Sequence, residues 1–202
     1  FIIIVDEQSR ENEGDLVISA EFITDKQMGW MIKNTSGIIC VPAPKKKLYE
    51  LGLHQMVNVN TEVNSTNFTL STDYKIGTTT GVSAIDRCKT VRALVNPLAK
   101  AKDFSKPGHI FPLIYTEGGV LKRQGHTEAS IDICKLCNLE PVSVIGELTD
   151  NNGNILNRNK SLKFAHKHKI PICSIEQIRN HILSSHIKFN IDSSTITFLS
   201  ET

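Results

Sequence analysis

The chain has 202 residues, of which 40% are hydrophobic and 22% are charged, and its formal net charge is +2. This composition excludes disordered, fibrous and membrane-embedded proteins and favours one soluble globular domain with a sizeable core. Every apolar run is shorter than the roughly 20 residues that span a bilayer, so no membrane partner is predicted.

The one basic run and the cysteines give little sign of nucleic-acid binding, disulfide bonds or a zinc site. Residues 45–47 are three lysines without interleaved aromatic residues, which predicts a solvated loop and no nucleic-acid partner. The five cysteines are scattered and odd in number, which favours a reducing, cytoplasmic compartment. Cys134 and Cys137 form a single C-x-x-C pair, so core packing is expected rather than a zinc site.

The chain starts at Phe1 without methionine, and we expect upstream residues, where an organellar targeting peptide could lie.

The first part of the chain is predicted to contain short strands and one helix. Residues 1–5 form a β-branched run, which is typical of a strand buried on both faces. Thr24 and Gln27 have the spacing of a capping box, and the apolar residues after them predict a helix that ends near Asn34. Two later runs have strand patterns, at residues 38–41 and 68–72.

The second part is predicted to be mainly helical. Ser83 and Asp86 again have capping spacing, and the apolar stripe after them ends before Pro97. Further helices are expected from about Thr127 and over residues 174–182. Because strands and helices mix without a βαβ repeat, we predict an α/β (α+β) fold with one mixed sheet flanked by helices. From residue 184 onward, serine-rich turns and the alternating residues 195–198 indicate an appended strand or ordered tail.

Three carboxylates lie close together in residues 10–15, which read Arg-Glu-Asn-Glu-Gly-Asp. An extended backbone would place Glu11, Glu13 and Asp15 on one side. Such a cluster repels itself unless a cation, Arg10 or protonation relieves it, so a divalent metal site is a reasonable hypothesis. On composition alone, a solvated acidic turn is at least as good an interpretation.

Two loops rich in glycine each precede a predicted helix. Residues 77–81 offer free amides and hydroxyls that could bind a phosphate, although a plain tight turn is the more common structure for such a loop. In the second loop, Arg123 can hold phosphate, Thr127 can cap the helix, and His126 can bind a metal or transfer protons. His109 lies in another Gly/Pro-rich segment, which we expect to be a loop. The residues alone therefore indicate a metal-assisted enzyme that acts on a small phosphorylated substrate.

Four segments together resemble the signature motifs of the 3,4-dihydroxy-2-butanone 4-phosphate synthase family, in the same order and spacing. They are residues 10–15, 77–84 with Asp86 and Arg87, 107–109 and 123–128. The resemblance extends from Phe1 to about Leu183 and includes residues 146–149 and a closing helix at 164–168. It implies a synthase domain over residues 1–183, with its N-terminal helix missing, and a C-terminal extension over residues 184–202.

The resemblance implies a lyase of riboflavin biosynthesis that converts D-ribulose 5-phosphate into 3,4-dihydroxy-2-butanone 4-phosphate and formate through enediolate chemistry. Glu11 and His126 would hold magnesium, or manganese, while His109, Glu147 and Asp15 would be catalytic. Arg10 and Asp15 would contact the sugar hydroxyls, and the loop from Arg123 would bind the phosphate. The implied substrate contacts are Arg10, Glu11, Asp15, Cys40, Thr80, Arg123, Gln124, Gly125, His126, Thr127 and Glu147.

The resemblance also implies a homodimer with active sites at the subunit interface. Many members are fused to a GTP cyclohydrolase II domain, whose three-cysteine zinc motif is not found in this sequence. Gln8 and Ser9 interrupt the usual acidic run, and Ile114 replaces a common arginine. A buried strand thiol is nearly as good an interpretation of Cys40.

Two other functions fit the same residues. The first is another metal-dependent sugar-phosphate isomerase or aldolase, which would release no formate. The second is a non-catalytic homologue that binds a sugar phosphate without turnover. A histidine ligand on its own favours manganese or another transition ion, so the choice of magnesium rests on the resemblance.

Overall fold

The computed structural model describes the backbone of residues 1–194 and the side chains of residues 1–184. Seven strands form one sheet in the order β4-β5-β3-β6-β2-β1-β7. β1 pairs with β7 and β3 pairs with β5 in parallel, whereas the other neighbours are antiparallel. The predicted mixed sheet is therefore confirmed. The strands are β1 (Ile2–Val5), β2 (Gly14–Ser19), β3 (Cys40–Ala43), β4 (Thr72–Tyr74), β5 (Phe104–Ile114), β6 (Ser143–Glu147) and β7 (Ile172–Ser174).

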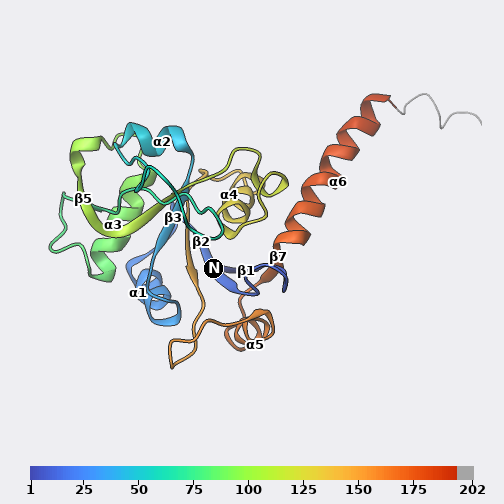
Figure 1. Cartoon of the computed structure of the whole chain (residues 1–202), viewed down its shortest axis with the longest axis horizontal. Helices are drawn as coiled ribbons and strands as arrows, with labels where there is room; N and C mark the ends of the chain where they lie inside the picture. The colour runs from blue at the N-terminus through green and yellow to red at the C-terminus, as the bar shows by residue number, and fades with distance from the viewer. Residues whose placement is uncertain (195–202) are drawn as a thin grey trace, which may run out of the picture.

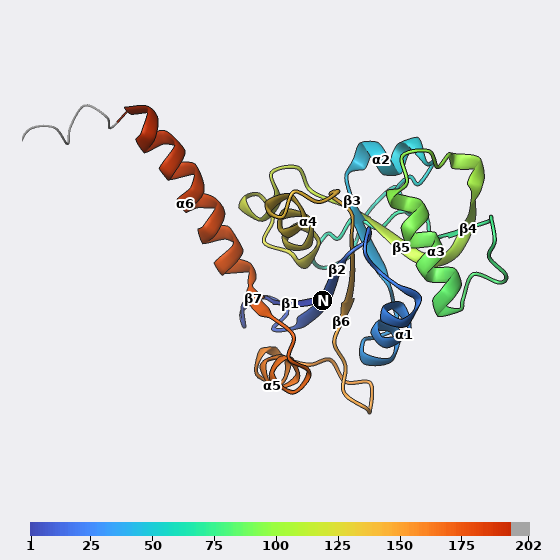
Figure 2. The same cartoon turned by 180° about the vertical axis from the view of Figure 1, so that it is seen from behind.

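Helices cover both faces of the sheet, with α4 on one side and α1 and α3 on the other (Figures 1 and 2). Ile3 and Val5 of β1 point into the larger core, whereas Ile4 points into the smaller one beneath α4 and α6. β1 is thus buried on both faces, as its β-branched run predicted. The helices are α1 (Asp25–Asn34), α2 (Lys45–Glu50), α3 (Ala84–Val95), α4 (His126–Leu136), α5 (Arg158–His168) and α6 (Ile175–Ser194), with short 3-10 turns η1 (Ala101–Asp103) and η2 (Gly119–Leu121).

Two helices begin at the residues that the sequence indicates. Thr24 caps α1, because its hydroxyl accepts a hydrogen bond from the backbone N–H of Gln27. The Gln27 side chain accepts one from the Thr24 N–H in return, which completes the capping box. At α3, the Ser83 hydroxyl accepts a hydrogen bond from the Asp86 N–H at 3.0 Å.

The start and end of α4 differ from the prediction. The helix begins at His126, so Gly125 occupies the cap position and Thr127 lies inside the first turn. The prediction that Thr127 caps the helix was therefore wrong. Cys134 is buried as expected, but Cys137 is exposed because it follows the last helical turn.

Two predictions in the middle of the chain need correction. Residues 45–47 form the first turn of α2 rather than a solvated loop, because Leu48 anchors this helix in the core. The strand expected over residues 68–72 is displaced, because β4 spans Thr72–Tyr74 and shares only Thr72 with that range. Phe68 makes only an isolated bridge to Leu113, so regular pairing starts later in the chain.

β5 runs through the segment that was expected to be a Gly/Pro-rich loop. The register of β4 against β5 shifts between Thr72 and Asp73, and residues 106–109 bulge out of the pairing. A Cβ at Gly108 would lie 2.1 Å from the Thr72 carbonyl carbon, so glycine is required for this close approach of two backbones. His109 therefore extends from a bulge within a strand, and strand pairing on either side holds it in place.

α6 follows β7 and extends away from the sheet (Figure 1). Its predicted start is confirmed, because the Ser174 hydroxyl accepts a hydrogen bond from the Gln177 N–H at 3.1 Å. Within the described residues from Ser184 to Ser194 the helix continues in place of the expected turns, because this stretch contains neither glycine nor proline. Residues 195–198, predicted to be strand-like, lie outside the described residues. Among the described helices, none is both long enough and apolar enough to span a bilayer.

Candidate active site

A cavity of about 230 Å³ lies over the central strands, between the β1–β2 loop and the first turn of α4. It brings together segments that are far apart in the sequence. Eight of the predicted site residues line it: Arg10, Glu11, Asp15, Cys40, Arg123, His126, Thr127 and Glu147.

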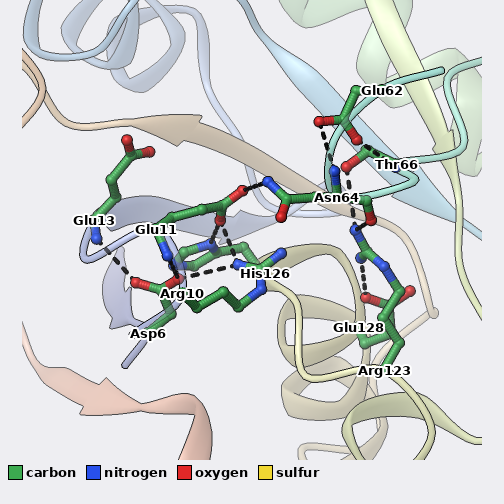
Figure 3. A network of polar contacts seen from close by, with 10 residues as sticks. All are labelled: Asp6, Arg10, Glu11, Glu13, Glu62, Asn64, Thr66, Arg123, His126 and Glu128. Atoms are coloured by element: carbon green, nitrogen blue, oxygen red, sulfur yellow. Dashed lines mark hydrogen bonds and ion pairs between the residues drawn. The ribbon is translucent and has the colours of Figure 1, made fainter. Parts of the chain in front are cut away.

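The loop between β1 and β2 is folded around the buried carboxylate of Asp6 (Figure 3). Asp6 Oδ2 accepts hydrogen bonds from Arg10 Nη1 at 3.1 Å and from the Glu11 N–H at 2.9 Å. Asp6 Oδ1 accepts one from the Glu13 N–H at 2.9 Å. The backbone is not simply extended, because Asn12 adopts a φ of 57°. The acidic side chains nevertheless reach one cavity, as predicted, and the supporting role of Asp6 was missed.

Glu11 and His126 meet in this cavity. Glu11 Oε2 lies 3.4 Å from His126 Nδ1 (Figure 3). Two adjacent ligand atoms on an octahedral Mg²⁺, each about 2.1 Å from the ion, are about 3 Å apart, so the spacing suits a shared ion. His126 is 6% exposed, and its Nε2 has no hydrogen-bond partner among the described residues. With Asp6, the two residues offer three ligand atoms within 4.8 Å of one another, which fits a divalent cation.

Carboxyl groups next to this pair hold their protons more tightly than usual. Burial, followed by the nearby charge of Glu147, raises the pKa of Glu13 to about 7. Burial also raises the pKa of Asp15 to about 6, although His126 opposes the shift. Asp15 lies directly opposite Glu147 in the β2–β6 pairing. The site therefore contains carboxyl groups that titrate near neutral pH, which suits general acid–base catalysis.

The imidazole of His126 also holds a proton tightly. Burial lowers its pKa, but the Asp15, Glu11 and Asp6 carboxylates together outweigh burial and raise the pKa to about 9. A metal ion must displace this proton, so we expect divalent-cation affinity to fall about tenfold for each pH unit below the His126 pKa. Calorimetric titration of Mn²⁺ between neutral and mildly alkaline pH would measure the slope. A flat profile would contradict the assignment of His126 as a ligand.

Arg123 is fixed from two sides (Figure 3). Its Nη1 donates to Glu128 Oε2 at 2.6 Å, and Glu128 is buried. Its Nη2 donates to the Asn64 carbonyl at 3.0 Å and to Thr66 Oγ1 at 3.1 Å. A Cβ at Gly125 would lie 2.3 Å from Arg123 Nη1 and 2.8 Å from Glu128 Oε2. Gly125 thus leaves room for the ion pair, a role that the sequence did not reveal.

Gly125→Ala is expected to raise KM for a phosphorylated substrate by about tenfold, which corresponds to about 1.4 kcal/mol, with a smaller effect on kcat. The added methyl group would push the Arg123 guanidinium away from Glu128. Steady-state kinetics would measure the change. Gly29→Ala in α1 is a suitable control, because its Cβ would meet only Ala84 at an ordinary 3.6 Å. An unchanged KM in Gly125→Ala would contradict this role.

Four predicted site residues are not among those that line the cavity, namely His109, Thr80, Gln124 and Gly125. His109 lies on the β5 bulge, where its Nδ1 is 2.7 Å from Asp73 Oδ2 and its side chain is 44% exposed. Thr80 is exposed in the loop before α3. Gln124 is exposed next to Arg123. The chain by itself therefore does not gather the whole predicted set.

The loop at residues 77–81 was given two interpretations, a phosphate site and the more common tight turn, and two of its backbone amides bind a side chain of the protein itself. The N–H groups of Thr79 and Gly81 donate to Asp86 Oδ2 at 3.1 and 3.2 Å, and the Thr79 hydroxyl donates at 2.7 Å. Asp86 belongs to the first turn of α3, so the helix supplies its own anion to these amides. The structure supports a tight turn at this position.

Cys40 and the three positions that depart from the family pattern differ in their distance from the cavity. Cys40 lines the cavity, and burial raises the pKa of its thiol far above the usual range, so the group is neutral. Gln8 and Ser9, which depart from the family pattern, are exposed and do not line the cavity. Ile114, the other departure, is buried in the larger core. None of the three changes a cavity-lining residue.

Comparison with known proteins shows the family of this chain. The profile of the family described as 3,4-dihydroxy-2-butanone 4-phosphate synthase matches residues 1–181. The 3,4-dihydroxy-2-butanone 4-phosphate synthase of Pseudoalteromonas translucida is 45% identical over 181 residues, which are 90% of this chain and 83% of that protein. The riboflavin biosynthesis protein RibBA of Endomicrobium trichonymphae is 46% identical over 90% of this chain, which spans only 45% of its length.

A crystal structure of 3,4-dihydroxy-2-butanone 4-phosphate synthase in complex with two magnesium ions has the same fold. It superposes with a TM-score of 0.87 and 37% identity, over 92% of each chain. Sequence and fold thus agree over nearly the whole described chain. The chain belongs to the 3,4-dihydroxy-2-butanone 4-phosphate synthase family.

Proposed function

We propose that this chain converts D-ribulose 5-phosphate into 3,4-dihydroxy-2-butanone 4-phosphate and formate in riboflavin biosynthesis. The observation that carries the proposal is one cavity that combines the Glu11–His126 donor pair with the guanidinium of Arg123. A ketose phosphate needs both features, because one end must be anchored while charge develops at the other. Membership of an enzyme family with this activity supports the same conclusion.

A divalent cation is proposed to bind Glu11 and His126. A solved relative that is 37% identical binds two magnesium ions. A bound ion would supply Lewis acidity that polarises the substrate ketone and stabilises enediolate oxygens. Because oxygen ligands suit Mg²⁺ and an imidazole also suits Mn²⁺, we expect either ion to support activity.

The residues of the cavity are assigned complementary roles. Arg123 anchors the phosphate, with Gln124, Gly125 and Thr127 forming the loop and helix start around it. Arg10 and Asp15 contact the sugar hydroxyls, and the neutral Cys40 thiol lines the same wall. Glu147 transfers protons, with assistance from Asp15, whose raised pKa lets it exchange a proton near neutral pH.

A second copy of the chain is proposed to complete the site. His109 and Thr80 lie outside the cavity, and both are exposed. Exposed apolar side chains lie next to Thr80, namely Val82 at 50% and Ile85 at 51% exposure. A two-fold dimer that buries this surface could bring His109 of the partner subunit to the cavity. We therefore propose a homodimer with active sites at the interface.

Asp73 is expected to prepare His109 for proton transfer. Asp73 accepts the His109 N–H at 2.8 Å, and its other oxygen contacts Nδ1, which leaves Nε2 to react. Asp73→Asn would present an amide to Nδ1 and favour the wrong tautomer, so we expect kcat to fall about a hundredfold with little change in KM. Steady-state kinetics over a range of pH would measure this. Unchanged kcat would contradict the role.

The function itself is tested by incubating the purified protein with ribulose 5-phosphate and Mg²⁺. We expect formate and a four-carbon phosphate in equal amounts, detected by NMR, and no product after the metal is removed with a chelator. Turnover without formate would indicate an isomerase or aldolase. Binding without turnover would indicate a non-catalytic homologue.

Relatives place this domain in several settings. RibBA relatives contain it within a longer chain, and two plant relatives are named as chloroplastic bifunctional proteins. We propose that a GTP cyclohydrolase II domain accompanies this one in such fusions. The domain is proposed to work in the cytoplasm, or in the plastid where a targeting peptide directs it there.

A further inference from the structure

Asn64 reaches Glu11 from the segment between α2 and β4. Its Nδ2 donates a hydrogen bond to Glu11 Oε1 at 2.5 Å, although 53 positions separate the two residues in the sequence (Figure 3). The other oxygen, Glu11 Oε2, faces His126 Nδ1. A carboxylate with one oxygen held by an amide cannot rotate freely, so this contact keeps Oε2 directed at His126.

The backbone N–H and the carbonyl of Asn64 each make a hydrogen bond. Glu62 Oε1 accepts its N–H at 3.0 Å, and Arg123 Nη2 donates to its carbonyl at 3.0 Å. The same Arg123 nitrogen donates to Thr66 Oγ1, and Glu62 Oε2 accepts the Thr66 N–H at 2.6 Å. The segment is therefore pinned to Arg123, and one series of hydrogen bonds joins Arg123 to Glu11.

Arg10 contacts one oxygen of Glu11 and could bind both. Its Nη1 contacts Glu11 Oε2 and also Asp6 Oδ2. Because a guanidinium can bind both oxygens of a carboxylate, Glu11 could turn toward Arg10 if nothing held Oε1. In that arrangement Glu11 would no longer face His126. The Asn64 amide opposes this rotation.

We propose that Asn64 is a positioning residue for the metal ligand Glu11, and that Arg123 keeps Asn64 in place. The inference rests on the proposed metal site at Glu11 and His126. It means that the phosphate-binding arginine supports the metal site through the protein itself. Hydrogen bonds to metal ligands typically change metal affinity by about 10- to 100-fold, so the effect should be measurable.

The test measures Mn²⁺ affinity directly, by the EPR signal of free Mn²⁺ during titration of the purified protein. Asn64→Ala and the similarly sized Asn64→Leu should each weaken binding by about tenfold. Asn67→Ala is the matched control, because Asn67 lies in the same segment but contacts Gln55 instead of Glu11. We expect the control to bind Mn²⁺ as the unmodified protein does.

A double-mutant cycle tests the link through Arg123. Thr66→Val preserves shape but removes the hydroxyl that Arg123 holds, so we expect a smaller loss, about threefold, in Mn²⁺ affinity. If Thr66 acts through Asn64, Thr66→Val should cause no further loss in an Asn64→Ala background. Fully additive losses would overturn the link from Arg123 to Asn64.

Glu11→Ala separates this inference from the function it rests on. Wild-type Mn²⁺ affinity in both Asn64 variants, together with lost affinity in Glu11→Ala, would overturn the role of Asn64 and leave the metal site standing. Unchanged affinity in Glu11→Ala would overturn the metal site itself.

Discussion

Glu11→Ala is expected to lower kcat/KM for ribulose 5-phosphate by at least about a thousandfold, because a Lewis acid supplies several kcal/mol and each 1.4 kcal/mol is a factor of ten. The substitution removes one of the two side chains that converge at 3.4 Å. It would also leave the buried His126 without its nearest carboxylate. Formate release in the presence of saturating Mg²⁺ measures the loss.

Glu7→Ala is the matched control for this experiment. Glu7 lies in the same loop, but its half-exposed side chain pairs with Arg158 at 3.6 Å and does not line the cavity. We expect this variant to retain most of the activity, because exposed ion pairs contribute little. Equal losses in Glu7→Ala and Glu11→Ala would indicate a general disturbance of the loop rather than loss of a ligand.

Two inactive variants are expected to restore activity when they are combined in one dimer. Glu11→Ala should lose the metal, and His109→Ala should lose the proton-transfer group. If the partner subunit's His109 serves each cavity, a heterodimer of the two variants keeps one intact site. Such a heterodimer, purified with two different tags, should therefore show about half of the activity of the unmodified dimer.

This result would separate a shared site from a site within one chain. If His109 served the cavity of its own chain, each half of the heterodimer would carry one defect and the mixture would be as inactive as its parents. High activity in the His109→Ala homodimer would show that His109 is not needed at all.

Much of the fold followed from local patterns. The β-branched run at residues 1–5 gave a strand buried on both faces, and the capping residues Thr24 and Ser83 marked the starts of α1 and α3. These predictions succeeded because the determining contacts lie within a few residues. Residues 106–109 were misjudged as part of a loop, because pairing of β5 with β4 on either side of the bulge is a long-range property.

The residues of the site, like the elements of the fold, could be predicted in part from the sequence. Glu11, His126 and Arg123 could be chosen from motifs and from their chemistry, and the structure brings them to one cavity. Asn64 was missed, because it lies in a polar segment without a motif and gains significance only by reaching Glu11. Glu128 was likewise not singled out, because its role depends on the close approach of Arg123 over Gly125.

The central claim is that Glu11 and His126 share one divalent ion next to Arg123. Anomalous diffraction from crystals grown with Mn²⁺ tests it most directly. We expect an anomalous peak within about 2.5 Å of both a Glu11 oxygen and a His126 nitrogen. A fully occupied peak elsewhere, with neither side chain in contact with it, would rule out a shared ion at Glu11 and His126.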